Sequence, residues 1–312
     1  MVPVLDALPH LRRTVPALLR AAERTRGVEI VYVDNGSTDG SLEFLQSMQA
    51  PIVRVLSRPG ITIAALRNAG AALGHGAYLS FIDADCSIAE SYFDEAIDVL
   101  GSTQAAATGC EVTIPEAPHW IEATLHQMHF VGRDREVGFI NSGNFFVTRQ
   151  AFDAVGGFRE ELSTGEGVDI GQRLIAAGFR MRECPRVSAV HHGNPHSVGE
   201  YYRANVWHGL DMFDLRTLRQ LDRPTMMLLV HAAATIAGLV VLIGAPSPVV
   251  ARIAAALTLQ LMVPLATVAF RIRQTGRVPA LSRAVFLYWL YYVARLHAGL
   301  LVAFGRTNRQ RA

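Results

Sequence analysis

Two carboxylates stand one residue apart at the end of an apolar stretch. The segment YLSFIDADC covers residues 78–86 and places Asp83 and Asp85 directly after its apolar part. In an extended chain, residues i and i+2 point to the same face, so two like charges repel there unless a cation or hydrogen-bond donors offset them. Carboxylate oxygens are ligands that Mg²⁺ and Mn²⁺ prefer, often with substrate phosphates completing the shell. The pair therefore predicts a divalent-metal site.

A third carboxylate, Asp34, ends another strand-like stretch, EIVYV at 29–33. Ligands of open α/β sheets bind at the carboxyl ends of the strands, so Asp34 is expected at the same edge as Asp83 and Asp85. D-x-D by itself is a common pattern, and the alternative is a helix cap or a solvated turn. The strand placement together with Asp34 favours a functional site.

The elements that would position these residues alternate along the first half of the chain. Runs of β-branched and aromatic residues predict strands at 29–33, 52–56 and 78–82, and apolar residues at helical spacing predict helices at 42–48 and 64–73. This alternation predicts an α/β fold with a mixed, mostly parallel sheet flanked by helices. Further on we expect helices at 92–100, at 120–130, from a Ser163/Thr164 cap to Gly178 and at 200–210, and a short strand at 186–191.

Charge is divided unequally between the two ends of the 312-residue chain. All 29 basic residues are Arg; residues 1–224 hold 20 of them with all 27 acidic residues, whereas residues 225–312 hold 9 and no acid. The resulting net charges of −7 and +9 predict a basic C-terminal part that contacts a membrane or anions. The three cysteines lack metal-ligand spacing, which argues against a zinc site or a disulfide framework and fits a reducing compartment. We expect no nucleic-acid partner.

Three apolar segments follow, at 225–245, 249–270 and 284–304. The first two reach the roughly 20 residues that cross a bilayer, and the arginines on their outer flanks place both flanks in the cytoplasm. A third full span would carry Arg306, Arg309 and Arg311 to the opposite side, so we prefer two spans with an interfacial or re-entrant third helix over three spans. The expected organisation is a domain over 1–210, a membrane-proximal linker over 211–224 and a membrane region over 225–312.

Four motifs in order carry a resemblance to a known family. They are VDNGSTDGS (33–41), LRNAGAALGHGAYLSFIDADC (66–86), NSGNFFVTRQAFDAVGGFREEL (141–162) and TGEGVDIGQRLIAAGFR (164–180). Over roughly residues 3–210 the chain resembles the family 2 glycosyltransferases with a GT-A fold. The resemblance implies an inverting transfer of a sugar from a nucleotide-diphosphate sugar to an acceptor hydroxyl. The apolar C-terminus resembles that of membrane-anchored members, which implies a lipid-linked or cell-surface glycan acceptor and a bacterial inner membrane with the catalytic domain in the cytoplasm.

The same resemblance assigns residues to the donor site. It implies that the nucleotide pocket is lined by Asp34, Arg67 and Asp83. It implies that Asp85 binds the metal bridging the diphosphate, and that Gly143 and Asn144 face the donor sugar or acceptor. It further implies that His191 completes the Mg²⁺ or Mn²⁺ site beside Asp85, with His192 as the adjacent alternative.

The catalytic base departs from the family pattern. The family usually has Glu-Asp where this chain has Glu166-Gly167, and glycine cannot deprotonate an acceptor hydroxyl. Glu166 is the best remaining candidate, with Asp169 at i+3 on the same helix face. The alternative is that Glu166 is an ordinary first-turn acid and that Asp169 forms an intrahelical pair with Arg173.

Arg203, Trp207 and His208 occupy the place where processive relatives carry an Arg-Trp motif. Because the spacing differs, we do not infer a processive polymerase. An arginine could meet a diphosphate and a tryptophan could stack on a sugar. Amphipathic packing against the membrane is the alternative.

The start of the chain is the second departure, because the family begins with a buried central strand and here Met1 is followed at once by PVLD at 3–6. We expect most of that strand to be missing, through a misassigned start, with unpaired strand edges beside it. Taken together, the sequence predicts a metal-dependent glycosyltransferase. The alternatives are a non-catalytic nucleotide-sugar-binding homologue and a nucleotidyltransferase that releases pyrophosphate.

Overall fold

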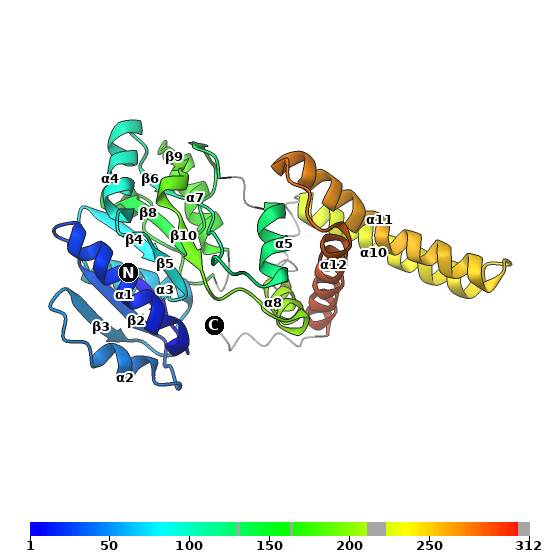
Figure 1. The fold of residues 1–312 in the computed structure, drawn as a ribbon, viewed down its shortest axis with the longest axis horizontal. Helices are drawn as coiled ribbons and strands as arrows, with labels where there is room; N and C mark the ends of the chain where they lie inside the picture. The colour runs from blue at the N-terminus through cyan, green and yellow to red at the C-terminus, as the bar shows by residue number, and fades with distance from the viewer. Residues whose placement is uncertain (130–131, 163–164, 211–222, 305–312) are drawn as a thin grey trace. The chain divides into compact units, whose positions relative to one another are not determined.

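The computed structural model describes residues 1–129, 132–162, 165–210 and 223–304, which fall into two compact units. The first unit is built from Met1–Glu116 and Val131–Asn194, and the second from Ala117–Phe130 and Pro195–Asn308. All the described strands belong to the first unit, and the long apolar helices belong to the second (Figure 1). The two short segments 117–130 and 195–210 therefore group with the apolar helices.

The first unit is centred on a mixed sheet. Three parallel strands lie in the order β1 (Val2–Val4), β2 (Ile30–Asp34), β3 (Val53–Ser57). Five more lie in the order β4 (Tyr78–Ile82), β8 (Asn144–Thr148), β6 (Ala107–Gly109), β9 (Met181–Glu183), β7 (Arg135–Glu136). Met1 joins the two groups, since its amino group donates to the Ser80 carbonyl (2.8 Å) and its carbonyl accepts from the Ile82 N–H (3.2 Å). The expected α/β class with a mixed sheet is confirmed.

Helices follow most strands, as the alternation predicted. They are α1 (Leu8–Arg24), α2 (Ser41–Gln46), α3 (Ile63–Leu73), α4 (Tyr92–Thr103), α6 (Arg149–Ala154) and α7 (Glu166–Ala176). Apolar residues of the helices and strands form two main buried clusters. One includes Leu11, Tyr32 and Tyr92, and the other includes Phe81, Phe145 and Phe158. The expected end of α7 is confirmed, because Gly178 has a φ of +85°. The expected cap at Ser163 and Thr164 lies outside the described residues.

The segment after β9 corrects one expectation. Residues 186–191 were expected as one strand, but Pro185–Val187 form a 3₁₀ turn and only Ala189–His191 form a strand, β10. Proline lacks an N–H and has a fixed φ, which suits the first position of a tight turn and not a paired strand. β10 pairs antiparallel with a strand that the sequence did not predict, β5 (Cys86–Ile88), and the register sets His191 opposite Cys86.

The first strand, β1, has three residues, against five in each of β2 and β4, and the expectation that it is shortened stays a prediction. Val2, Pro3 and Val4 pair in parallel with Tyr32, Val33 and Asp34, and β1 lies between β2 and β4. Both valines are buried, and Met1 bonds the backbone of β4. A cavity of about 270 Å³ adjoins Met1, with Glu29 and Tyr78 among its lining residues.

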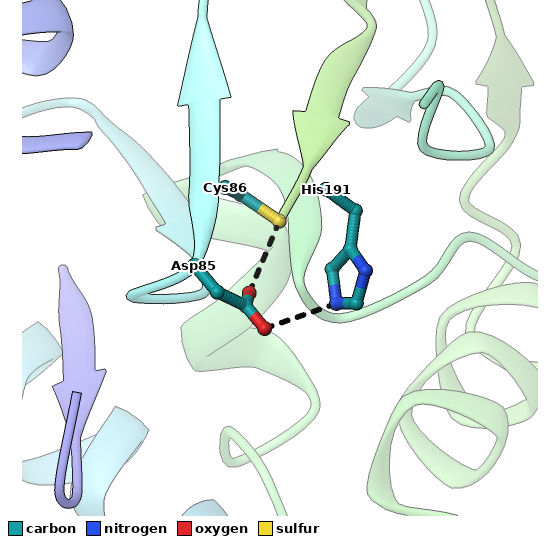
Figure 2. Close-up of side chains that lie close together, drawn as sticks. All are labelled: Asp85, Cys86 and His191. Atoms are coloured by element: carbon teal, nitrogen blue, oxygen red, sulfur yellow. Dashed lines mark hydrogen bonds and ion pairs between the residues drawn. The ribbon is translucent and has the colours of Figure 1, made fainter. Parts of the chain in front are cut away.

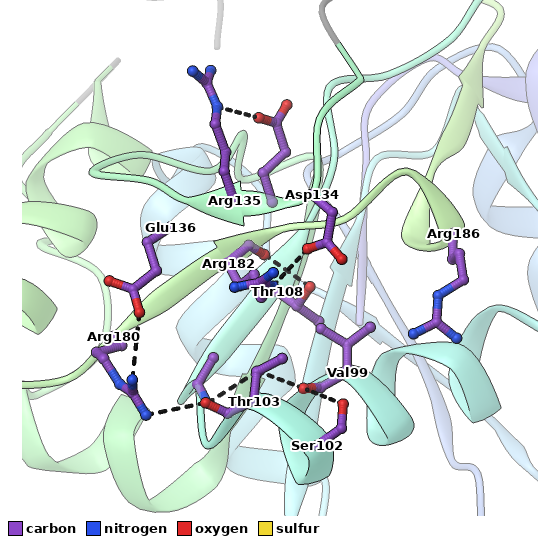
Figure 3. A network of polar contacts seen from close by, with 12 residues as sticks. Val99, Ser102, Thr103, Thr108, Asp134, Arg135, Glu136, Arg180, Arg182 and Arg186 are labelled. Atoms are coloured by element: carbon purple, nitrogen blue, oxygen red, sulfur yellow. Dashed lines mark hydrogen bonds and ion pairs between the residues drawn. The ribbon is translucent and has the colours of Figure 1, made fainter.

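Ion pairs lie around β7 and β9, at the other end of the sheet. Arg180 and Arg182 beside β9 reach Glu136 (3.4 Å) and Asp134 (2.5 Å), and Arg135 of β7 reaches Glu183 (3.2 Å) (Figure 3). The pairs of Arg180 and Arg182 are exposed and contribute little free energy each, about 0–1 kcal/mol, whereas Glu183 in the third pair is buried. Their place on the short outer strand β7 blunts an edge that could otherwise pair with another chain.

The second unit is helical. It contains α5 (Trp120–His129), α8 (Val198–Leu210), α10 (Arg223–Gly244), α11 (Val249–Thr275) and α12 (Leu281–Ala303). α10 and α11 pack side by side as a hairpin, and α12 packs against α11 and α8 (Figure 1). All three long helices have the length and composition to cross a membrane, so the unbroken α12 is a candidate span beside the two preferred from sequence. The flanking arginines Arg216, Arg219, Arg306, Arg309 and Arg311 lie outside the described residues.

Asn144 holds the first unit together where β8 begins. Its Nδ2 donates to the carbonyls of Cys110 (3.0 Å) and Val187 (2.8 Å), and its Oδ1 accepts from the Tyr92 hydroxyl (2.7 Å). The side chain is fully buried, so these partners would be left without water if it were removed.

We therefore expect Asn144→Ala to destabilise the first unit by about 2–4 kcal/mol, because buried carbonyls lose their donors. The check is the unfolding midpoint of the full chain followed by circular dichroism. Tyr92→Phe is the matched control, since it removes only one hydroxyl and should cost about 1 kcal/mol. Equal midpoints for Asn144→Ala and the unaltered chain would contradict the assigned role.

Candidate functional site

A buried guanidinium lies at the centre of the candidate site. Arg67 of α3 is 1% exposed, and its two terminal nitrogens contact Asp83 Oδ1 (2.7 Å) and Glu166 Oε1 (2.6 Å). Ser142 Oγ donates to the same Glu166 oxygen (2.6 Å). Burying an isolated arginine costs several kcal/mol, and two charge-assisted contacts offset that cost. The repulsion expected at Asp83 is thus relieved by Arg67.

The loop before β8 approaches Asp83 closely. The Asp83 N–H donates to the Gly143 carbonyl (3.1 Å). A Cβ at position 143 would lie 2.1 Å from Asp83 Oδ2, so only glycine permits this contact. Gly143 therefore lies beside the carboxylate that the sequence placed in the donor site. The Asn144 side chain faces the core instead, where both of its amide protons are used.

Asp85 has a different partner from Asp83. Its Oδ2 lies 3.1 Å from His191 Nε2, and its Oδ1 lies 3.6 Å from Cys86 Sγ (Figure 2). The ligand atoms of these three residues all lie within 4.8 Å of one another. The pairing of β5 with β10 creates this group, because it sets His191 opposite Cys86. The structure thus brings together the two residues expected to bind the metal.

The pKa values in this group follow from its mutual contacts. Burial would raise the pKa of Asp85, but the hydrogen bond and charge of His191 outweigh it and hold that pKa below its ordinary value. Burial would lower the pKa of His191, but the hydrogen bond and charge of Asp85 outweigh it and raise that pKa. Burial raises the pKa of the Cys86 thiol. A carboxylate with an imidazole fits a divalent cation such as Mn²⁺ better than a soft metal.

Two neighbours of this group, His192 and Gly193, were left open or missed by the sequence. His192, the alternative to His191, is held by Ser87 Oγ (2.8 Å) and Arg13 Nη1 (3.1 Å). A Cβ at Gly193 would lie 1.9 Å from Asp85 Oδ2, so glycine is required there. The HHG triplet was the available signal, but only the β5–β10 register shows which histidine meets Asp85.

Asp34 ends β2 with one oxygen satisfied. Its Oδ2 accepts from the N–H groups of Gly36 (2.8 Å) and Ser37 (3.1 Å). Its Oδ1 is buried and has no hydrogen-bond partner among the described residues. A buried carboxylate oxygen without a donor costs about 1–3 kcal/mol or more, so a ligand N–H or O–H would be bound favourably here.

The first turn of α7 holds the candidate base. Glu166 is 8% exposed, and both its contacts described above are made by Oε1. A Cβ at Gly167 would lie 3.2 Å from the Ser142 side chain, so a larger residue there would press on Ser142. Asp169 pairs instead with Arg173 (2.6 Å) and Arg159 (3.1 Å), which matches the intrahelical alternative for this residue.

The three residues expected near the acceptor lie together on α8, in the second unit. Trp207 is 40% exposed, and its ring lies edge-on to that of His208 with the ring centroids 4.7 Å apart. Arg203 lies one turn beyond Gly199 on the same helix, with Nη1 within 3.5 Å of the position of a Cβ there. These roles stay predictions.

Comparison with known proteins gives a consistent picture. A family model described as glycosyl transferase family 2 matches residues 1–159. Glycosyltransferase AglE of Haloferax volcanii is 24% identical over 204 residues, covering 62% of this chain and 66% of that protein, just under two thirds. The N-acetylglucosaminyl-diphospho-decaprenol L-rhamnosyltransferase of Mycobacterium tuberculosis is 27% identical over 231 residues, covering 61% and 74%. The solved mannosyltransferase of Pyrobaculum calidifontis, in complex with GDP-Man and Mn²⁺, has the same fold, with a TM-score of 0.59, 16% identity and coverage of 98% and 86%.

Gly193→Ala should lower the Mn²⁺ affinity of the chain at least about tenfold, because the new methyl group displaces the Asp85 carboxylate. Free Mn²⁺ measured by electron paramagnetic resonance checks this. Gly101→Ala is the matched control, since a Cβ there meets nothing within 4 Å, and should leave the affinity within about twofold. Unchanged Mn²⁺ binding by Gly193→Ala would remove Asp85 from the metal site.

Proposed function

Because the chain belongs to glycosyl transferase family 2, we propose that it is an inverting enzyme that moves a sugar from a nucleotide-diphosphate sugar to an acceptor hydroxyl. The observation that carries the proposal is the separate pairing of the two carboxylates after β4. Asp83 is tied to Arg67, and Asp85 remains with His191 at the strand edge. In this arrangement Asp83 holds Arg67 in place, and Asp85 would be the carboxylate that binds a cation.

Asp85 and His191 are the residues that would hold Mg²⁺ or Mn²⁺. Their ligand atoms are adjacent, and the glycine at 193 leaves room beside the carboxylate. A bound divalent cation would neutralise charge on the leaving diphosphate. The Mn²⁺ in the related mannosyltransferase structure supports a divalent metal for this fold.

Asp34 is the residue that would recognise the nucleotide. Its unpartnered Oδ1 can accept an N–H of a base or an O–H of a ribose, while the backbone of Gly36 and Ser37 holds the other oxygen in place. Such a donor would relieve the cost of the bare oxygen, so the pocket is preorganised for a hydrogen-bond donor.

Glu166 is the proposed base. Arg67 and Ser142 both bond Oε1 of this residue, so Oε2 is the oxygen that would meet an acceptor hydroxyl. Gly167 stands where the family usually has its catalytic Asp, and this favours the second candidate, a homologue that binds nucleotide sugars without turnover. The two candidates differ in whether a nucleoside diphosphate is released.

We further propose that the acceptor is lipid-linked or part of a cell-surface glycan and that the first unit faces the cytoplasm at a bacterial inner membrane. Three helices long and apolar enough to span a bilayer support membrane association. The arginines at 271–283, where α11 ends and α12 begins, support a cytoplasmic flank. The name of the mycobacterial relative describes a lipid diphosphate acceptor, which supports an acceptor of this class.

Donor binding tests the site first. We expect one of UDP, GDP, CDP or dTDP to raise the thermal midpoint of the purified chain in the presence of Mn²⁺, and the shift to vanish without the metal. Asp85→Asn should lose the shift, because it removes a charged ligand. A shift that is the same with and without Mn²⁺ would contradict the metal-dependent site.

Turnover tests the base. Glu166→Gln should lower the rate of sugar transfer by roughly 10²–10⁴ while donor affinity stays within about threefold, because the amide cannot take a proton. Asp169→Asn is the matched control on the same helix and should keep the rate within about threefold. If Asp169→Asn lost the larger share of activity, the roles would be exchanged. If the unaltered chain bound donor without releasing nucleoside diphosphate in the presence of lipid acceptors, the binding homologue would be favoured.

A further inference from the structure

The second compact unit contains a cavity of about 500 Å³. This volume lies within the range of roughly 300–1,000 Å³ that is typical of small-molecule sites. Its walls come from α5, α8, α10, α11 and α12. Polar groups at the cavity are supplied by Arg223, Arg271, His129, Asn205 and the tyrosines 201, 288, 291 and 292, whereas apolar wall is supplied by residues such as Met227, Ala266 and Phe270.

The cavity lies at one end of the three long helices. Arg223 is the first residue of α10 and Arg271 is in the last turn of α11, and the hairpin brings these two ends together. Tyr288 lies in the second turn of α12, which begins shortly after α11 ends. Arginines and tyrosines at the end of spanning helices are typical of the boundary between hydrocarbon and water. The cavity is therefore expected at the level of lipid head groups.

The described residues that line this cavity carry positive charge. Arg223 stacks over the Phe270 ring at 3.8 Å, and Arg271 donates to the amide oxygen of Gln274 (3.1 Å). Burial and the charge of Arg271 lower the pKa of His129 to about 4, so this histidine is neutral at pH 7; it bonds the Tyr288 hydroxyl at 3.2 Å. No carboxylate is among the described lining residues, and the sequence from 225 to 312 contains none.

Two guanidinium groups beside an apolar wall favour one class of ligand. Arginine binds phosphate oxygens through its planar fork, and this contact strengthens where water is excluded. Neutral hydroxyl and amide groups, as on Tyr291 and Asn205, can add hydrogen bonds without opposing an anion. Phe270 is 38% exposed on its helix, so the apolar wall continues onto the surface of α11. Basic cavities between membrane helices on the cytoplasmic side suit anionic lipid heads.

We propose that this cavity binds the phosphate or diphosphate head of a lipid, with Arg271 and Arg223 on the phosphate and the chain along the wall formed by Ala266 and Phe270. The proposal that a lipid phosphate binds here is argued from the cavity alone. The further proposal that this lipid is the sugar acceptor rests on the proposed function.

The test uses the full chain in nanodiscs of phosphatidylcholine, with binding of farnesyl phosphate counted by native mass spectrometry. Arg271→Gln should weaken this binding at least tenfold. Arg273→Gln is the matched control, because Arg273 is exposed in the same turn of α11 and does not line the cavity, and it should change binding less than twofold. Equal losses in the two variants would overturn the site, since general surface charge would then explain the binding.

Three ligand arms separate the contributions. Farnesol, which lacks the phosphate, and inorganic phosphate, which lacks the chain, should each bind at least tenfold more weakly than farnesyl phosphate. Farnesol binding as tightly would overturn the role of the arginines. Phosphatidylglycerol supplied in the disc should not displace farnesyl phosphate; displacement would keep the lipid-phosphate site but overturn its identification with the acceptor.

A second variant guards against misfolding of Arg271→Gln. Ala266→Phe keeps both arginines and fills the cavity with a ring, so it should also weaken farnesyl phosphate binding at least tenfold. Nucleotide binding with Mn²⁺ should be unchanged in both variants, whereas Asp85→Asn should lose the nucleotide and keep farnesyl phosphate. Failure of the lipid site and failure of the donor site are thereby told apart. Normal farnesyl phosphate binding by Ala266→Phe would overturn the proposal.

Discussion

The buried guanidinium of Arg67 is the interaction on which the first unit's site depends. It joins three segments, since its partners Asp83 and Glu166 lie 16 and 99 residues away along the chain. A charge buried to this extent is stable only with its partners in place, so the end of β4, the start of α7 and helix α3 must adopt their positions together. Two carboxylates against one guanidinium still leave net negative charge. Asp85 adds to it beside them, which is the electrostatic reason that this edge suits a divalent cation arriving with a nucleotide diphosphate.

The sequence predicted those parts of the site that depend on local pattern. Asp34, Asp83 and Asp85 could be placed at strand ends because alternating apolar and helical stretches define where strands stop. The contacts between distant segments could not be derived in this way. The local sequence does not predict β5, because this strand has only three residues. The pairing of β5 with β10 is what places His191, and not His192, beside Asp85. The pattern at 186–191 likewise predicts one strand, but Arg186 and Val187 belong to the turn that begins at Pro185.

The glycine at position 167 lies beside Ser142, the residue that bonds Glu166. α7 begins close enough to the loop before β8 for Ser142 to bond Glu166, and a Cβ at 167 would press on that same serine. The absence of a side chain therefore coincides with a tightened carboxylate at the preceding residue. The departure from the family pattern therefore goes with a specific geometry, in which Arg67 and Ser142 bond Oε1 of Glu166 and leave Oε2 without either contact. Asp169 pairs with two arginines, Arg159 and Arg173, and its catalytic role stays a prediction.

The second unit shows what composition can and cannot determine. An excess of arginine in residues 225–312 is accounted for in general by the preference of basic residues for the cytoplasmic side of a membrane. That rule treats Arg271 and Arg273 alike, since they lie two residues apart at the end of one helix. Only the fold distinguishes them, because Arg271 lines a cavity beside Tyr288 and Phe270 and Arg273 is exposed. An exposed arginine is satisfied by water or by any anionic lipid. An arginine against an aromatic wall with no carboxylate in the described lining is satisfied best by an anion that brings its own apolar chain, and this requirement connects the cavity to a lipid phosphate.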